Sequence, residues 1–269
     1  MPRPQVARPR VFHLSAAARA HAKLTCRTPA VVEFIEAEIM DVHWVEAALA
    51  YLYVFAGILF VVGSIYFLPG FSAYMEAGCY LYLIGGAIYL MCALFDLEEA
   101  AHVGHKFEVC MNVGYLVGSV AFNVATVCYV PEVTERLGEV SAGTYGSAGF
   151  VVGSLLFIFA CFLNGAHTGD TFSGGSDESR VAKGLVLATT NSTMFGSCLF
   201  LVGSVLYMPE IGCGESTAVI GTWCYLWGSV CFVAAGVLPL VRSHRVELAK
   251  PLACKTAGPQ GHAACYVLV

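Results

Sequence analysis

The chain has 269 residues, of which 58% are hydrophobic and only 12% are charged, and its mean hydropathy is +0.71. This composition is too apolar for an ordinary soluble domain and is typical of an integral membrane protein. The formal net charge of −5 gives no argument for a basic or acidic partner, and nothing in the chain resembles a nucleic-acid-binding surface, so no nucleic-acid partner is expected.

Residues 1–46 form a basic N-terminal arm followed by a juxtamembrane segment. No acidic residue precedes Glu33, while Arg, Ala and Pro are frequent, which suits either a cytosolic arm or an organellar transit peptide. Whether residues 1–32 are cleaved, and which membrane holds the protein, therefore stay open. Residues 33–46 are expected to continue as an interfacial helix into the first membrane span.

Six apolar runs are each long enough to cross a hydrocarbon core, which needs about 20 residues at a rise of about 1.5 Å each. None of them contains Asp, Glu, Lys or Arg. Each run must be helical, because no water is present in the hydrocarbon to pair the backbone. The predicted limits are 47–68, 77–95, 109–130, 144–163, 185–208 and 217–241.

The short links predict how these spans pair. Spans one and two, three and four, and five and six should form antiparallel hairpins, at residues 47–95, 109–163 and 185–241. Residues 164–184, rich in Gly and Ser, are expected to be a flexible linker, and the tail 242–269 is expected to be disordered. The predicted fold is therefore an all-α polytopic membrane protein built from three hairpin repeats of the same orientation.

The Lys and Arg residues predict the orientation of the spans. Of the 14 in the chain, only Arg136 falls on the side that carries the links within the hairpins. Positive residues gather on the inner side of a membrane, which places both termini inside.

One motif occurs in all six spans: an aromatic residue, two residues, a glycine followed by Ser or Gly, two residues and a second aromatic. At about 100° per residue the glycine and both rings share one stripe of the helix. Small residues let helices approach closely in lipid, so we interpret the stripe as a packing surface; a pore or ligand surface is the alternative. The central glycines are Gly63, Gly85, Gly118, Gly153, Gly203 and Gly228.

Two groups of polar residues are the candidates for chemistry. Glu98, His102 and His105 would share one face if the second helix continued, and would then suit a metal ion; the alternative, which we favour, is a solvated helix end without a metal. Asn112, Asn123 and Asn191 lie within spans, where hydrogen bonding between helices is the expected role and a polar solute path is the alternative. No catalytic or cofactor-binding residue and no cofactor is predicted.

The third hairpin has a Gly-Ser pair in each helix, a Gly-Thr-Trp start to the second helix and a basic residue after it: Gly203, Ser204, Gly221, Thr222, Trp223, Gly228, Ser229 and Arg242. In these residues it resembles the YrhK-like domain, a small two-helix membrane hairpin. Hairpins one and two look like looser copies, which would make three tandem domains. In hairpin two, however, the Tyr-x-Pro-Glu sequence at 129–132 lies seven residues further from its central glycine, Gly118, than the one at 207–210 lies from Gly203.

The resemblance implies a fold and a membrane location but no reaction. We therefore expect a non-catalytic scaffold or assembly partner in the lipid bilayer, as a homo-oligomer or with a membrane-protein partner. A transporter or channel for a small neutral solute is the alternative.

Overall fold

A computed structural model describes residues 29–104, 106–171, 177–211 and 214–256. Within these ranges the chain is all-helical, and six of the helices are long and apolar enough to cross a membrane. The spans run over 47–66, 75–102, 106–128, 139–168, 180–206 and 216–242. The predicted fold class is confirmed: the protein is a polytopic, six-span membrane protein.

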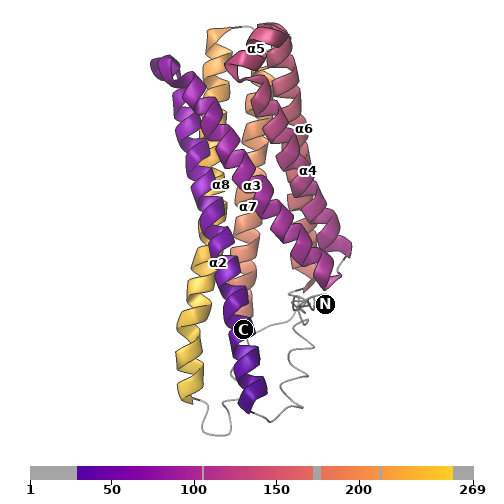
Figure 1. The fold of residues 1–269 in the computed structure, drawn as a ribbon, viewed down its shortest axis with the longest axis vertical. Helices are drawn as coiled ribbons and strands as arrows, with labels where there is room; N and C mark the ends of the chain where they lie inside the picture. Colours follow the sequence, from indigo (N-terminus) through magenta and orange to yellow (C-terminus); the bar gives the residue numbers. More distant parts are fainter. Residues whose placement is uncertain (1–28, 105, 172–176, 212–213, 257–269) are drawn as a thin grey trace, which may run out of the picture.

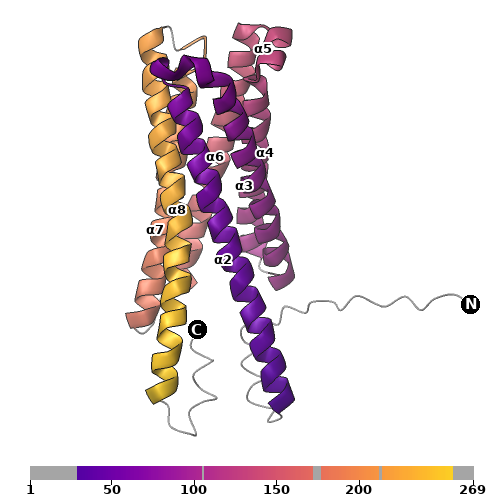
Figure 2. The same cartoon turned by 60° about the vertical axis from the view of Figure 1, so that its left-hand side comes forward.

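Six long helices form a closed ring (Figures 1 and 2). Each helix packs against the next one in chain order, and α8 closes the ring by packing against α2. The pairs α2/α3, α4/α6 and α7/α8 correspond to hairpins one, two and three, and we keep these names. The helices are α2 (Pro29–Tyr66), α3 (Met75–Val103), α4 (Lys106–Cys128), α6 (Glu139–Thr171), α7 (Asp177–Leu206) and α8 (Glu215–Thr256).

Two short helices lie at the same end of the ring, which we call the loop end. The 3-10 helix η1 (Pro69–Tyr74) joins α2 to α3, and α5 (Pro131–Leu137) lies between α4 and α6. Proline begins α5 where no backbone donor is needed, and Gly138, with φ 81°, ends it. The opposite end, where α2 begins and α8 ends, is the terminal end (Figure 1).

The helices extend further than the sequence suggested. The predicted linker 164–184 is helical on both sides, in α6 up to Thr171 and in α7 from Asp177. Thr168 is buried and donates its hydroxyl hydrogen to the Asn164 carbonyl one turn earlier, so packing continues α6 beyond the apolar run. The first part of the predicted disordered tail, up to Thr256, belongs to α8, because its Val, Glu, Leu, Ala and Lys residues include good helix formers. Residues 1–28 and 257–269 lie outside the described ranges.

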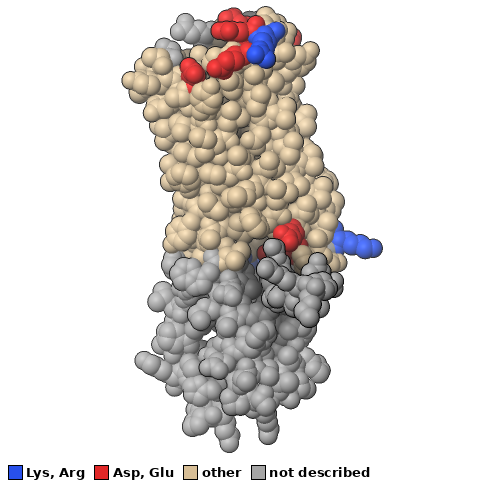
Figure 3. Space-filling view, in the orientation of Figure 1, with Lys and Arg blue, Asp and Glu red and all other residues tan. Residues whose placement is uncertain are grey.

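The surface has the pattern of a membrane protein. Figure 3 shows charged side chains near the two ends of the described part and an uncharged band between them. Large apolar side chains within the spans, such as Phe162 and Trp227, are 68% and 57% exposed. Such exposure is favourable where lipid tails cover the helices.

Candidate functional site

Glycine and aromatic residues interlock where two helices of a hairpin meet. A methyl group placed on Gly78 would lie 2.9 Å from the Phe67 ring, and the Tyr207 ring lies 2.8 Å from the equivalent point on Gly221. The ring of Tyr129 contacts Gly146 in the same way in hairpin two. Each glycine therefore leaves a notch, a depression without a side chain, that an aromatic ring of the other helix fills.

A second layer of these contacts lies about two helical turns nearer the terminal end. Here the notches are at Gly85, Gly153 and Gly228, and the rings that fill them are Phe60, Phe122 and Phe200. Both layers occur once in each hairpin, so the three hairpins share one packing pattern around the axis of the ring. A third set of contacts joins Gly63 to Tyr82 and Gly203 to Tyr225.

Hairpin two departs from the other two in the register of its motif. Because Phe122 fills the same kind of notch as Phe60 and Phe200, the position of Gly63 and Gly203 is taken by Ala125, which is fully buried. Gly118 lies seven residues before Ala125, where it receives the Phe157 ring. The late Tyr-x-Pro-Glu sequence of hairpin two thus follows from a shifted glycine, because the rings themselves keep the register of the other hairpins.

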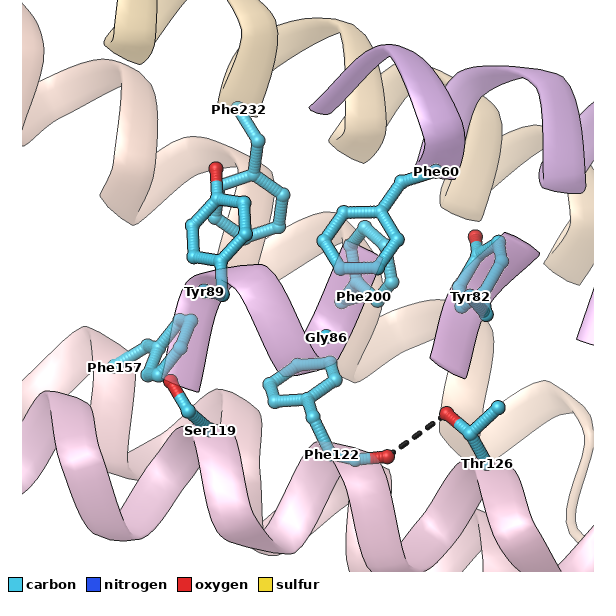
Figure 4. Close-up of a pocket in the computed structure, with 10 residues that line it drawn as sticks. All are labelled: Phe60, Tyr82, Gly86, Tyr89, Ser119, Phe122, Thr126, Phe157, Phe200 and Phe232. Atoms are coloured by element: carbon cyan, nitrogen blue, oxygen red, sulfur yellow. Dashed lines mark hydrogen bonds between the residues drawn. The ribbon is translucent and has the colours of Figure 1, made fainter. Parts of the chain in front are cut away.

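Rings from different hairpins meet across the axis. The ring centroids of Phe122 and Phe200 lie 5.6 Å apart, those of Phe150 and Tyr225 5.8 Å, and those of Tyr89 and Phe232 5.9 Å. Figure 4 shows seven such rings around Gly86. The void between them has a volume of only about 20 Å³, which is room for a single water molecule.

Serine and threonine hydroxyls beside the notches pair with tyrosines. The Tyr225 hydroxyl donates to Ser204 Oγ at 3.0 Å, and the Tyr82 hydroxyl lies 2.6 Å from Ser64 Oγ. Ser64 and Ser204 also donate to the carbonyl four residues earlier. In hairpin two the corresponding ring is Phe150, so the hydroxyl is absent there. These hydroxyls therefore form hydrogen bonds within and between the helices of a hairpin. Ser154 Oγ in hairpin two is buried and has no hydrogen-bond partner among the described residues.

A larger hollow lies on the terminal side of this aromatic core. This terminal cavity has a volume of about 410 Å³. Tyr89, Phe157 and Ser119 border both the terminal cavity and the small void, so they form the boundary between the hollow part and the filled part of the ring. The other residues that line the terminal cavity are Tyr53, Ala93, Asp96, Glu99, Ala100, Glu108, Met111, Asn112, Tyr115, Asn164, Thr189, Thr193, Ala235, Gly236 and Pro239.

A carboxylate lies on the wall of the terminal cavity. Asp96 is partly buried within the span 75–102, and its Oδ2 accepts a 2.6 Å hydrogen bond from the Tyr53 hydroxyl. The Asn112 side chain donates to the Asp96 backbone carbonyl at 3.2 Å, which fixes α4 against α3. The sequence-based span ended at residue 95, so this carboxylate was placed outside the membrane by one residue.

The three hairpins place equivalent positions around the terminal cavity. Tyr53 and Tyr115 each lie seven residues before the ring that fills the second layer of notches, and Thr193 has this position in hairpin three. By the same register Asp96, Asn164 and Pro239 are equivalent. The cavity is therefore a consequence of the repeat, but of the three positions equivalent to Asp96 only the one in hairpin one carries a carboxylate.

The helix that carries Glu98 and His102 ends before it reaches the third candidate metal ligand, His105. Helix α3 ends at Val103 and Gly104 follows with φ 79°, so the helix that would carry all three candidates does not continue. His102 is exposed, and its Nδ1 lies 2.7 Å from the backbone carbonyl oxygen of Glu98. His105 lies outside the described residues. Among the residues that the structure describes, no cluster of three or more His, Cys, Asp or Glu residues suits a metal ion.

The three asparagines do not line one path. Asn112 borders the terminal cavity, whereas Asn123 packs against Gly86 and donates to the Ser119 carbonyl at 2.8 Å. Asn191 is exposed on the outside of the ring. The polar lining consists mainly of residues that the sequence reasoning missed, above all Asp96, Tyr53 and Tyr115. Aligning hairpins two and three by their Tyr-x-Pro-Glu sequences would have revealed that Tyr115 and Thr193 are equivalent.

One family of known proteins matches two segments of the chain. The family model for YrhK-like proteins matches residues 43–99 and 185–244, which cover hairpins one and three. The predicted third copy, in hairpin two, is not among the matched segments and stays a prediction. No curated protein and no solved structure matches the chain. The chain is therefore a multi-pass membrane protein that carries two YrhK-like domains, one in each of hairpins one and three.

Proposed function

We propose that the protein is a non-catalytic membrane protein with a scaffold or assembly role. The observation that carries this proposal is the filled aromatic core, in which rings from all three hairpins contact one another across the axis. In this core the motif residues pack against one another, and the void between them has room for only about one water molecule. Contacts between the helices therefore account for the motif glycines and for the hydroxyls beside them.

The proposed orientation has both termini on the inner side of the membrane. Its support is the distribution of Lys and Arg, of which only Arg136 falls at the loop end. In this orientation the terminal cavity faces inward. A second copy or another membrane protein would then meet the exposed apolar faces of the ring, while lipid covers the rest.

A transporter is the second candidate, and the terminal cavity is the observation that favours it. A hollow of about 410 Å³ reaches from the terminal end to the aromatic core. Transport would require the boundary residues Tyr89 and Phe157 to move, since they separate this hollow from the core. The carboxylate of Asp96 on the wall favours a cation over the neutral solute that composition alone suggested.

A flux experiment separates the two candidates. Full-length protein is reconstituted into liposomes and uptake of glycerol, urea and small ammonium ions is measured against empty vesicles. The scaffold proposal expects no excess uptake, and a pore-forming toxin added at the end of each run verifies that the vesicles are sealed.

The matched variants are Asn112→Leu, on the cavity wall, and Asn123→Leu, which lies between α3 and α4 away from the cavity lining. Uptake of one solute that is lost in Asn112→Leu and retained in Asn123→Leu would overturn the scaffold proposal in favour of transport.

A further inference from the structure

The terminal cavity has the size and lining of a small-molecule site. Its volume of about 410 Å³ lies within the range of roughly 300–1,000 Å³ that ligand sites in proteins have. Apolar and aromatic side chains supply much of its wall, and a few polar groups converge on it from α2, α3, α4, α6 and α7. A wall of this kind holds an apolar body and orients it by a small number of polar contacts.

The charges on the wall are negative. Asp96, Glu99 and Glu108 line the cavity, and its lining contains no Lys or Arg. Glu108 has a basic neighbour, since its Oε1 lies 3.3 Å from Nε2 of His167. Among the described residues, Asp96 has a single side-chain hydrogen bond, from the neutral Tyr53 hydroxyl, and Glu99 adds a like charge nearby. The potential inside the cavity therefore favours a cation.

The carboxylate of Asp96 has no counterpart in the other two hairpins. A charged side chain inside a membrane span costs about 3 kcal/mol on insertion scales, so it is kept where it has a role. The equivalent positions in hairpins two and three are Asn164 and Pro239, and those helices are formed without a carboxylate. A neutral pair can form a hydrogen bond at an equivalent position: Asn164 donates from Nδ2 to Thr190 Oγ1 at 2.9 Å.

Aromatic side chains surround the carboxylate. Tyr53, Tyr89, Tyr115 and Phe157 all border the cavity, and the Tyr53 and Tyr89 ring centroids lie 5.0 Å apart. Aromatic faces attract ammonium groups and exclude water from them. A bare metal ion instead needs a shell of several oxygen ligands, and among the described residues no cluster of three or more His, Cys, Asp or Glu suits one.

We propose that the terminal cavity is a binding site for a small organic cation. The ammonium group lies at Asp96, where Tyr53 holds the carboxylate, and the apolar part of the ligand packs against Tyr89, Tyr115 and Phe157 at the end of the aromatic core. Glu99 and Glu108 attract the cation toward the cavity. This site is independent of the scaffold role, because binding requires no passage through the core.

The test measures binding of a charged probe and its neutral counterpart to full-length protein in lipid nanodiscs. The probes are 2-phenylethylammonium and 2-phenylethanol, which share the ring and chain and differ in the charged group; binding is measured by equilibrium dialysis at low salt. We expect saturable binding of the ammonium compound and at least about tenfold weaker binding of the alcohol.

The decisive variant is Asp96→Asn, which keeps an oxygen that can accept the Tyr53 hydroxyl hydrogen but removes the charge. It should weaken binding of the ammonium probe by at least about tenfold while the protein elutes unchanged in gel filtration. The matched control is Glu132→Gln, a carboxylate at the loop end that does not line the cavity, and it should bind like the unmodified protein.

Three results would each overturn the proposal. The first is equal binding of the amine and the alcohol, and the second is unchanged amine affinity in Asp96→Asn. The third is absence of amine binding to the unmodified protein, whether or not Na⁺ or Mg²⁺ binds in an Asp96-dependent way. None of them bears on the flux experiment, so failure of this site and failure of the scaffold role are distinguishable.

Discussion

The part of the ring near the loop end and the part near the terminal end are built from the same three hairpins but filled differently. Toward the loop end, layers of glycine notches each receive a ring, and the remaining void is about 20 Å³. Toward the terminal end the equivalent positions carry Tyr53, Tyr115 and Thr193, or Asp96, Asn164 and Pro239, and a cavity of about 410 Å³ remains. The repeat thus determines where the helices lie, and the side chains on it decide whether the axis is filled or hollow.

The comparison also explains why similar motifs should tolerate change differently. A ring in the filled part has neighbours on every side, so it cannot move when its notch is closed. A ring at the boundary, such as Phe157, has the cavity beside it. Substitutions that differ only in this respect are the sharpest way to test the comparison.

The largest effect is expected for leucine in a notch of the filled part. In Gly63→Leu and Gly203→Leu the new side chain collides with Tyr82 or Tyr225, whose atoms lie 2.6 Å and 3.2 Å from the added Cβ position. We expect a loss of about 3 kcal/mol or more in the free energy of unfolding, at or beyond the upper end for overpacked cores. The midpoint of unfolding in sodium dodecyl sulfate and the monodisperse fraction in gel filtration measure it.

The control for this pair is Gly165→Leu, because nothing lies within 4 Å of the corresponding position in α6. It should unfold like the unmodified protein. Equal losses in all three variants would mean that leucine harms any helix here and that the notches have no special role.

A smaller loss is expected for Gly118→Leu. Its notch receives Phe157, which borders the terminal cavity and can shift into it. We expect a loss of about 1–2 kcal/mol, measured in the same unfolding assay. A loss as large as that of Gly63→Leu would contradict the view that the two parts of the ring are packed differently.

Two tyrosine hydroxyls give the next comparison. Tyr225→Phe removes the 3.0 Å hydrogen bond to Ser204 in the filled part and should cost about 0.6 kcal/mol, the average for hydrogen bonds between membrane helices. Tyr89→Phe removes a hydroxyl beside the cavity that forms no hydrogen bond with the described residues. This change should leave the free energy of unfolding almost unchanged. The reverse order of unfolding midpoints would refute the assignment of Tyr225 to a structural network.

The smallest effect concerns the loop end, outside both parts. The Thr144 hydroxyl donates to Glu210 Oε1 at 2.7 Å, and this hydrogen bond lowers the pKa of the exposed Glu210 carboxyl below its ordinary value of 4.5. A lowered pKa in the folded state adds stability above pH 4.5 that is lost as the pH falls below it. Glu210→Gln should therefore lower the unfolding midpoint slightly at pH 7, and this difference should shrink as the pH is lowered below 4.5. A difference that stays the same down to pH 2 would mean that charge is not its cause.

The sequence supported the fold better than the site. Span limits could be predicted to within a few residues, since long runs without charge have no alternative to a helix in lipid. The ends of the helices could not, because packing continues α6 beyond Asn164, as the buried Thr168 shows, and α3 beyond residue 95. The second error placed Asp96 outside the membrane and hid the cavity to which it belongs.

What the sequence alone determined is the set of parts: six apolar helices, their grouping into three like hairpins, and a stripe of glycines and rings on each, because composition and period follow from the chain without reference to any neighbour. Only the tertiary structure decided which ring fills which notch, that the motif glycine of hairpin two is shifted by two turns while its rings keep their register, and that Asp96 lies on the wall of a cavity. These depend on how three hairpins meet around a common axis. Contacts between residues more than a hundred positions apart, such as Ser64 and Ser229, are set by that meeting and not by local pattern.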